Sequence, residues 1–222
     1  TGGEDILKDY DLGKLLKLFG VILKIRKKEE DLDLFTLFNF DFLAKKFGLD
    51  YLDTLKLSRF ASDLKINFWE SLNHPDILKK STVKNTTAFK VLLESLNRWS
   101  GYSFNYSFTE FFEKVTQESG YLDWVLSLSD SVEKLNRLNS LFTQVKRLNL
   151  ADHTITLERF FEDLSILIES NIALIEEDLD IKTEAVSLTT AHGAKGQEFD
   201  YVFIVMCLDG KFGNNKVREL IK

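Results

Sequence analysis

Apolar residues recur every three or four positions along most of the first 180 residues, which is typical of helices that bury one face. Residues 5–28 and 130 to about 149 show the pattern most clearly. Further helices are predicted in the following ranges: one or two within 34–47, then 55–64, 68–72, 89–99, 108–115 and 157–168. The sequence has one proline and 11 glycines, so long helices are favoured over a turn-rich β architecture.

Polar and helix-breaking residues indicate where these helices begin and end. Asp50 and Thr156 are candidates for helix N-caps, and either Asn85 or Thr86 is the candidate for a third. Pro75 is expected to end the helix before it. Residues 101–107 are predicted to form a loop between two helices.

The pattern changes near residue 181, where short apolar runs replace the helical spacing. Residues 185–189 and 201–206 are apolar, rich in β-branched side chains and bounded by polar residues or glycine, which predicts two buried strands. The expected fold class is therefore mainly α: a helical, bundle-like subdomain over 1–180 and a short α/β fragment over 181–222.

The loop between the two predicted strands carries the candidate chemistry. Gly196 allows a positive φ or a close approach to a ligand, and Lys195 provides a point charge suited to phosphate. Glu198 is a hydrogen-bond acceptor for a ribose hydroxyl. Thr190 and His192, two positions apart, are placed to donate to a phosphate backbone. Each residue alone also has an ordinary explanation: a loop lysine is usually solvated, and Glu198 could cap a short helix.

Taken together, these residues form one string: Thr190-x-His192-x-x-Lys195-Gly196-x-Glu198-Phe199-Asp200-x-Val202-Phe203. This string resembles the fifth conserved motif of the UvrD/Rep/PcrA family of superfamily 1 DNA helicases. It departs from the family at Gln197, where Leu is usual, and at Gly213, where Pro is frequent. Gly2-Gly3 and the helix after it resemble the exit from the second RecA-like domain into the helical insertion called 2B. Residues 157–170 resemble the helix that closes this insertion.

The resemblance implies a fragment of an ATP-dependent 3′–5′ DNA helicase of DNA repair or recombination, located in the cytoplasm. Residues 1–180 are then a 2B-like subdomain, and residues 181–222 are part of the second RecA-like domain. Glu198 and Gly196 are expected to contact nucleotide, and Thr190, His192 and Lys195 to contact DNA or couple the two sites. ATP and Mg²⁺ are the implied cofactors of the parent. Its implied partners are single- and double-stranded DNA and the remaining helicase domains.

The motor residues of such an enzyme are missing from this sequence. It contains no Walker A pattern, no Asp-Glu magnesium pair after a strand and no sixth-motif arginine. We therefore assign no catalytic or metal-binding residue, and we expect no cofactor and no ATP hydrolysis for residues 1–222 alone. The alternative is a stand-alone, non-catalytic helical interaction module with a vestigial helicase loop.

Composition and charge limit the classes of function that this chain can have. A net charge of −6 argues against strong binding of nucleic acid by the isolated chain. Two local basic clusters are candidates for duplex DNA contacts or are simply solvated helix ends: Lys24, Arg26, Lys27 and Lys28, and Lys79, Lys80 and Lys84. The one cysteine excludes a disulfide framework, and no apolar run is long enough to span a membrane.

Overall fold

The computed structural model describes residues 5–29, 34–151 and 155–176, followed by 189–190, 194–196, 198–199 and 201–204. The backbone divides into two units, Thr1–Asp180 and Ile181–Lys222. We call them the helical unit and the C-terminal unit. All helices of the described residues belong to the helical unit. The assignment of the helical unit to a 2B-like subdomain and of the C-terminal unit to a RecA-like fragment stays a prediction.

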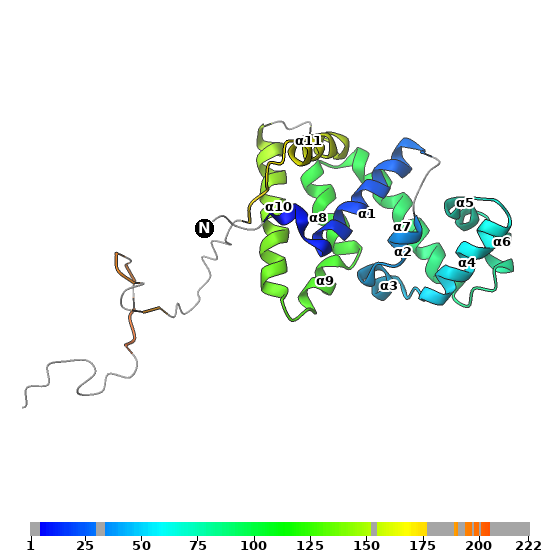
Figure 1. Ribbon diagram of the computed structural model, residues 1–222, viewed down its shortest axis with the longest axis horizontal. Helices are drawn as coiled ribbons and strands as arrows, with labels where there is room; N and C mark the ends of the chain where they lie inside the picture. Colours follow the sequence, from blue (N-terminus) through cyan, green and yellow to red (C-terminus); the bar gives the residue numbers. More distant parts are fainter. Residues whose placement is uncertain are drawn as a thin grey trace, which may run out of the picture. The chain divides into compact units, whose positions relative to one another are not determined.

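The described part of the helical unit consists of α-helices joined by short connections, with one turn of 3-10 helix in front (Figure 1). In chain order they are η1 (Ile6–Lys8), α1 (Tyr10–Lys27), α2 (Leu34–Phe38), α3 (Asp41–Phe47), α4 (Tyr51–Asp63), α5 (Phe68–Asn73), α6 (Pro75–Lys80), α7 (Thr86–Asn105), α8 (Phe108–Glu118), α9 (Tyr121–Leu126), α10 (Ser131–Ala151) and α11 (Leu157–Glu169).

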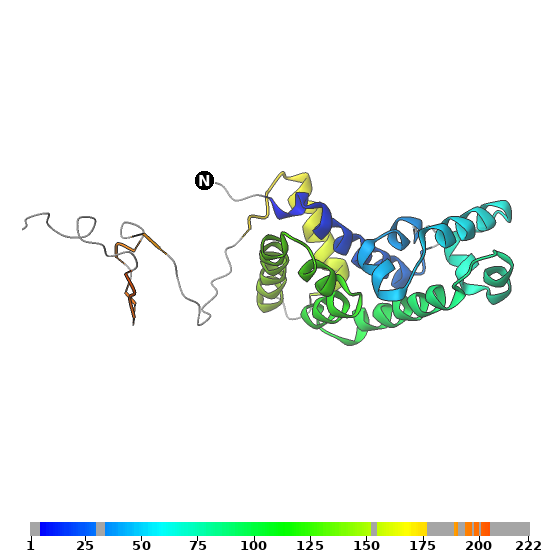
Figure 2. The ribbon, with the colours of Figure 1, turned by 90° about the horizontal axis from the view of Figure 1, so that it is seen from below.

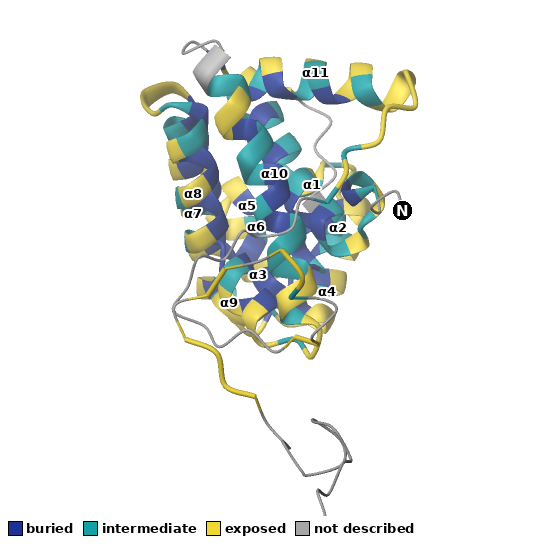
Figure 3. Ribbon diagram, turned by 90° about the vertical axis from the view of Figure 1, so that its left-hand side faces the viewer, coloured by how far each residue is buried: buried dark blue, intermediate teal, exposed yellow. Residues whose placement is uncertain are grey.

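The core of the helical unit forms where α1 packs against α7, α10 and α11, while α8 packs against α7 and α10. Figure 3 shows the buried faces of these helices turned toward one another. Aromatic rings fill much of the space: the ring of Phe19 on α1 lies 5.3 Å from each of Phe111 and Phe112 on α8. Phe108 of α8 meets Phe160 of α11 at 4.7 Å. Edge and tilted ring contacts of this kind hold the helices in one register.

Helices α4, α5 and α6 lie at one end of the helical unit, away from α10 (Figures 1 and 2). The buried side chain of Asp53 on α4 ties this end to the start of α7. Its Oδ2 accepts the backbone N–H groups of Lys84 at 2.9 Å and Asn85 at 3.0 Å, and its Oδ1 accepts from Lys56 at 3.1 Å. The carboxylate therefore positions the turn before α7.

The first and last described segments of the helical unit lie side by side. Asp5 and Ile175 form an antiparallel bridge. The Ile6 N–H donates to the Leu174 carbonyl at 2.9 Å, and the Leu174 N–H donates to Asp5 Oδ1 at 3.1 Å. The described part of this unit therefore begins and ends at one place.

Arg137 of α10 fastens both segments, and we call the set Asp9, Arg137 and Glu176 the terminal clamp. Its guanidinium pairs with Asp9, the N-cap of α1, and lies 3.4 Å from Glu176 after α11; it also pairs with Glu133. The hydrogen bond with Asp9 raises the pKa of Arg137 in spite of its burial. The side chains of Arg137 and Asp9 are only 15% and 7% exposed, so this is a largely desolvated pair.

The predicted loop over 101–107 is wrong, because α7 continues through Gly101 to Asn105. The buried side chains of Ser100 and Ser103 continue the inner face of α7, and packing outweighs the weak helix propensity of Gly101. Helices α6 and α9, each six residues long, were also not predicted as separate elements.

The α/β fragment is not seen in the described residues. The first predicted strand, 185–189, lies outside them except for Thr189, and Tyr201, Val202, Phe203 and Ile204 form no strand. The physical reason is that two short strands bury too little surface to form a stable sheet by themselves.

Candidate functional site

The predicted loop is partly described, and a turn lies within it. The Ala194 N–H donates to the carbonyl of Thr190 at 2.9 Å, and residues 194–196 form the turn itself. This bond brings the Thr190 carbonyl against Ala194, the residue before Lys195. His192 lies outside the described residues, so its predicted role stays a prediction.

Gly196 adopts a backbone conformation that favours glycine. Its φ is +85°, and a Cβ atom at this position would meet nothing within 4 Å. The glycine is therefore needed for the left-handed turn and not for lack of space. Lys195 and Glu198 on either side of it are exposed, so a cation and a carboxylate are presented within four residues of each other.

The apolar residues that follow the loop are strongly exposed within the C-terminal unit. Tyr201 and Phe203 are 85% and 86% exposed, and Val202 and Ile204 are 68% and 61% exposed. Four consecutive large apolar side chains in water are unusual for a folded domain.

Two cations of the first basic cluster make contacts inside the helical unit. Arg26 Nη1 donates to the Ser103 carbonyl at 3.3 Å, and its guanidinium lies 4.1 Å from the ring centre of Phe104. Lys27 pairs with Glu158 of α11 at 2.5 Å, and this hydrogen bond raises the pKa of Lys27 despite desolvation. These two cations therefore join α1 to α7 and α11.

The second basic cluster lies at the end of α6 and before α7. Lys79, Lys80 and Lys84 are all exposed. The backbone of Lys84 is held by Asp53, as described above, but its side chain extends into solvent. This arrangement fits a solvated helix end as well as a DNA contact.

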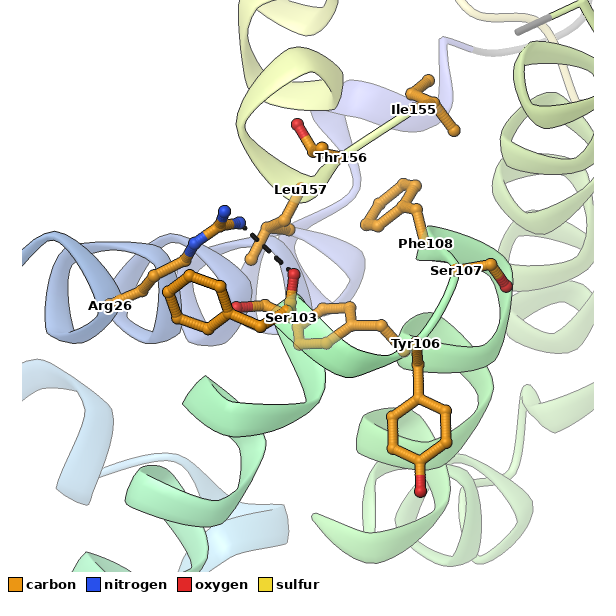
Figure 4. Close-up of a pocket in the computed structure, with 10 residues that line it drawn as sticks. Arg26, Ser103, Tyr106, Ser107, Phe108, Ile155, Thr156 and Leu157 are labelled. Atoms are coloured by element: carbon orange, nitrogen blue, oxygen red, sulfur yellow. Dashed lines mark hydrogen bonds between the residues drawn. The ribbon is translucent and has the colours of Figure 1, made fainter. Parts of the chain in front are cut away.

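A cavity of about 350 Å³ opens where α1, α7, α8 and α11 meet, and the sequence did not predict it. Figure 4 shows Arg26 reaching it from α1, Phe108 from α8 and Thr156 from the start of α11. Ser107 and Thr156, the N-caps of α8 and α11, both line it. The sequence signal for it is the pair of aromatic residues Phe104 and Tyr106, which lie in the range predicted as a loop.

The described residues contain neither a metal-binding cluster nor a membrane-spanning helix. No group of three or more His, Cys, Asp or Glu side chains among them is placed to hold a metal ion. None of the described helices combines the length and apolar character needed to cross a bilayer.

Comparison with known proteins identifies relatives along nearly the whole chain. The chain is 22% identical over 214 residues to the ATP-dependent DNA helicase PcrA of Bacillus subtilis, covering 94% of this chain and 28% of that protein. It is 24% identical over 215 residues to the ATP-dependent DNA helicase PcrA of Staphylococcus epidermidis, covering 92% of this chain and 27% of that protein. The chain therefore spans less than a third of these relatives.

A shorter match links the chain to a second kind of helicase. Over 121 residues it is 35% identical to one subunit of the ATP-dependent helicase/nuclease of Streptococcus uberis, covering 54% of this chain and 10% of that protein. The relatives therefore include proteins whose names carry a nuclease as well as those named for helicase activity alone.

A family profile extends across both units. The UvrD-like helicase C-terminal domain matches residues 26–220, which include most of the helical unit and the loop with Thr190, Lys195 and Glu198. A match over most of the chain establishes that the chain is a member of this family. The chain belongs to the UvrD-like helicase C-terminal domain family.

Proposed function

We propose that this chain is a fragment of an ATP-dependent 3′–5′ DNA helicase of DNA repair or recombination. In this proposal the helical unit is the regulatory 2B-like insertion, and the C-terminal unit is part of the second RecA-like domain. The observation that carries the proposal is the family match over residues 26–220, because it includes the helical unit and the candidate loop in one continuous stretch.

The turn at residues 194–196 supports a coupling role for the loop. In the proposal, Glu198 accepts a hydrogen bond from the nucleotide sugar, while Thr190, His192 and Lys195 contact or orient DNA. The left-handed Gly196 lets the chain reverse between these two groups of residues. A movement at one site would then shift the other through a few backbone bonds.

The exposed residues after the loop support a place inside a larger motor domain. Tyr201, Val202, Phe203 and Ile204 have the composition of a buried strand but are exposed in this chain. Pairing with further strands of a RecA-like sheet would bury them.

The cofactors of such a helicase fit this chain only in part. Glu198 and the adjacent turn offer a sugar contact, but the described residues provide no cluster of acidic ligands for Mg²⁺. Neighbouring parts of the parent would therefore hold the magnesium ion and stabilise the charge that develops on the transferred phosphoryl group. This chain would supply positioning and coupling.

The proposal is tested in a longer protein that carries the Walker A loop. Glu198→Ala should raise the KM for ATP and leave DNA affinity unchanged, and His192→Ala should do the reverse. Glu169→Ala, at an exposed position of α11, is the matched control. If both loop variants retain full DNA-stimulated ATPase activity, the helicase role of the loop is refuted, and the interaction module becomes the better proposal.

A second measurement uses residues 1–222 alone. We expect no DNA-stimulated ATP hydrolysis, because the residues that perform this chemistry are missing from the sequence. Clear turnover in a preparation free of other ATPases would refute the fragment hypothesis.

A further inference from the structure

The C-terminal end of α7 presents two exposed aromatic side chains, each beside a cation. Phe104 is 64% exposed and Tyr106 is 40% exposed. The guanidinium of Arg26 lies 4.1 Å from the ring centre of Phe104, and the ammonium of Lys114 lies 4.9 Å from that of Tyr106. We call these four residues the aromatic platform.

The ring of Tyr106 meets that of Tyr102 edge-on at 5.2 Å, but packing in the helical unit does not account for the exposure of Phe104. The core rings of this protein are almost completely buried, whereas most of the Phe104 side chain is open to solvent. Exposed aromatic faces next to Lys or Arg are the elements that bind single-stranded nucleic acid: bases stack on the rings and phosphates meet the cations. The platform combines both elements at one helix end.

Arg26 retains hydrogen-bonding capacity for a phosphate. Its Nη1 donates to the Ser103 carbonyl at 3.3 Å, while a guanidinium has five N–H donors in its plane. Stacking on Phe104 occupies the face of the guanidinium and leaves in-plane donors for an anion. Figure 4 shows the guanidinium at the cavity between α1, α7 and α11.

Two carboxylates lie near the platform cations, Glu158 near Arg26 and Glu110 near Lys114, but each makes its hydrogen bonds elsewhere. Glu158 is paired with Lys27, and Glu110 accepts hydrogen bonds from the Ser107 N–H at 3.0 Å and the Ser107 hydroxyl at 2.8 Å. These bonds with Ser107 lower the pKa of Glu110, so it stays engaged there as a carboxylate.

The two aromatic residues lie close together in the chain, and each ring would stack a base separately. Phe104 and Tyr106 are two residues apart, so their Cα atoms are separated by at most about 7 Å. Stacking on both rings requires unpaired bases, because the bases of a duplex expose only their edges in the grooves. The chemistry therefore favours a single strand over a duplex.

We propose that the aromatic platform binds single-stranded DNA, with bases on Phe104 and Tyr106 and phosphates on Arg26 and Lys114. This goes beyond the proposed function, because it gives the helical unit a DNA contact of its own that does not depend on the loop at residues 190–198. Sequence preference is weak, since any base can stack.

The test measures fluorescence anisotropy of a labelled oligo(dT) strand of about 15 nucleotides with the chain 1–222. Phe104→Ala and Tyr106→Ala should each weaken binding about tenfold, the expected loss for one stacked base. Phe104→Trp should keep or improve affinity, which separates stacking from any effect on folding. Tyr51→Ala is the matched control, because it removes a ring that is 59% exposed at the other end of the unit.

Salt dependence gives an independent measurement. Two phosphate contacts on a single strand predict a slope of about −1.4 for log K against log salt concentration. Lys114→Gln should reduce this slope by about 0.7, and Lys79→Gln at the end of α6 should not change it.

Three results would overturn the proposal. They are no binding of oligo(dT) by the unaltered chain, equal losses for Phe104→Ala and Tyr51→Ala, or binding of a hairpin duplex that exceeds single-strand binding and is insensitive to both platform rings. Glu198→Ala should leave oligo(dT) binding to chain 1–222 unchanged. A failed platform and a failed loop hypothesis are therefore distinguishable.

Discussion

Replacing Arg137 by Met removes the cation that holds both ends of the helical unit. The unbranched side chain of methionine replaces the aliphatic stem of arginine without its guanidinium, so the change tests mainly charge and hydrogen bonding. It leaves Asp9 and Glu176 without the guanidinium that pairs with both. We expect the free energy of unfolding to fall and the first and last segments to separate.

The magnitude depends mainly on Asp9. Its side chain is 7% exposed, and breaking a buried ion pair by removing one partner costs about 3–5 kcal/mol. Asp9 retains the hydrogen bond from the Leu12 N–H at 2.7 Å, so we expect the lower end, about 3 kcal/mol. The pair with Glu133, whose side chain is 55% exposed, adds at most about 1 kcal/mol.

The assay is urea unfolding followed by tryptophan fluorescence, because Trp69, Trp99 and Trp124 all lie in the helical unit. Asp9→Asn is the partner variant, since Asn caps a helix as well as Asp but carries no charge. In a double-mutant cycle, the combined variant should lose about 2 kcal/mol less than the sum of the single variants.

Hydrogen exchange at the clamp localises the effect. The Ile6 amide, bonded to the Leu174 carbonyl, should exchange faster in Arg137→Met, and amides in the middle of α7 should change only through the loss of global stability. A loss below about 1 kcal/mol, or full additivity with Asp9→Asn, would refute the reasoning that a desolvated pair holds the two segments.

Changes at four further positions test other parts of the helical unit. Glu118→Ala removes the acceptor 2.8 Å from the Trp99 indole N–H and should cost about 2 kcal/mol in chemical denaturation, whereas Glu118→Gln, which keeps an acceptor, should cost less. Burial raises the pKa of Asp53, but hydrogen bonds from backbone N–H groups before α7 and from a lysine outweigh it, so the pKa is lowered. The contribution of Asp53 to stability is therefore present at pH values above its pKa in the unfolded chain and is lost as pH falls below about 4. In a pH series of thermal melts, Asp53→Asn should lose less stability at acid pH than the unaltered chain. Gly120→Ala should destabilise by about 1–2 kcal/mol, because its φ is +80° and a Cβ would lie 3.0 Å from a neighbouring side chain. Gly13→Ala inside α1 should stabilise by about 0.5–1 kcal/mol in the same melts, because a Cβ at this position meets nothing within 4 Å. If Gly120→Ala were more stable than Gly13→Ala, this explanation would be wrong.

Helices and their caps were predictable where the signal is local. The predicted caps Asp50 and Thr156 are confirmed: Asp50 accepts the Leu52 N–H at 2.7 Å, and Thr156 accepts the Arg159 N–H at 3.2 Å. Such bonds join residues two or three positions apart, so the pattern of nearby residues contains the necessary information.

Contacts between distant residues were not predictable in this way. Arg26 meets Ser103 across 77 positions, and Arg137 meets Asp9 across 128. Nothing in the neighbourhood of either arginine indicates its partner, because the partner is determined by which helix ends meet in the folded unit. For the same reason the sequence predicts a solvated surface or a DNA contact for the basic cluster around Arg26, and does not predict a junction of helices.

The candidate loop has features of both kinds, some set by nearby residues and some set by distant partners. A positive φ was one of two roles predicted for Gly196, and the structure confirms this one, because the conformation depends on its own short turn. The roles of Thr190, Lys195 and Glu198 stay predictions, since they depend on ligands and on parts of a motor domain that these residues would face. Residue identity was sufficient for the family but not for the geometry of binding.

The salt dependence of binding can separate two DNA contacts of the helical unit: a duplex at the second basic cluster and a single strand at the aromatic platform. The net charge of −6 and the internal pairing of Lys27 leave few cations for non-specific phosphate binding. A duplex contact through the Lys79, Lys80 and Lys84 cluster would depend mainly on ion release and would weaken steeply with salt. Stacking on Phe104 and Tyr106 would depend on salt only through the phosphates at Arg26 and Lys114, and so would persist as ionic strength rises. The salt dependence of binding therefore indicates which face of the helical unit DNA meets.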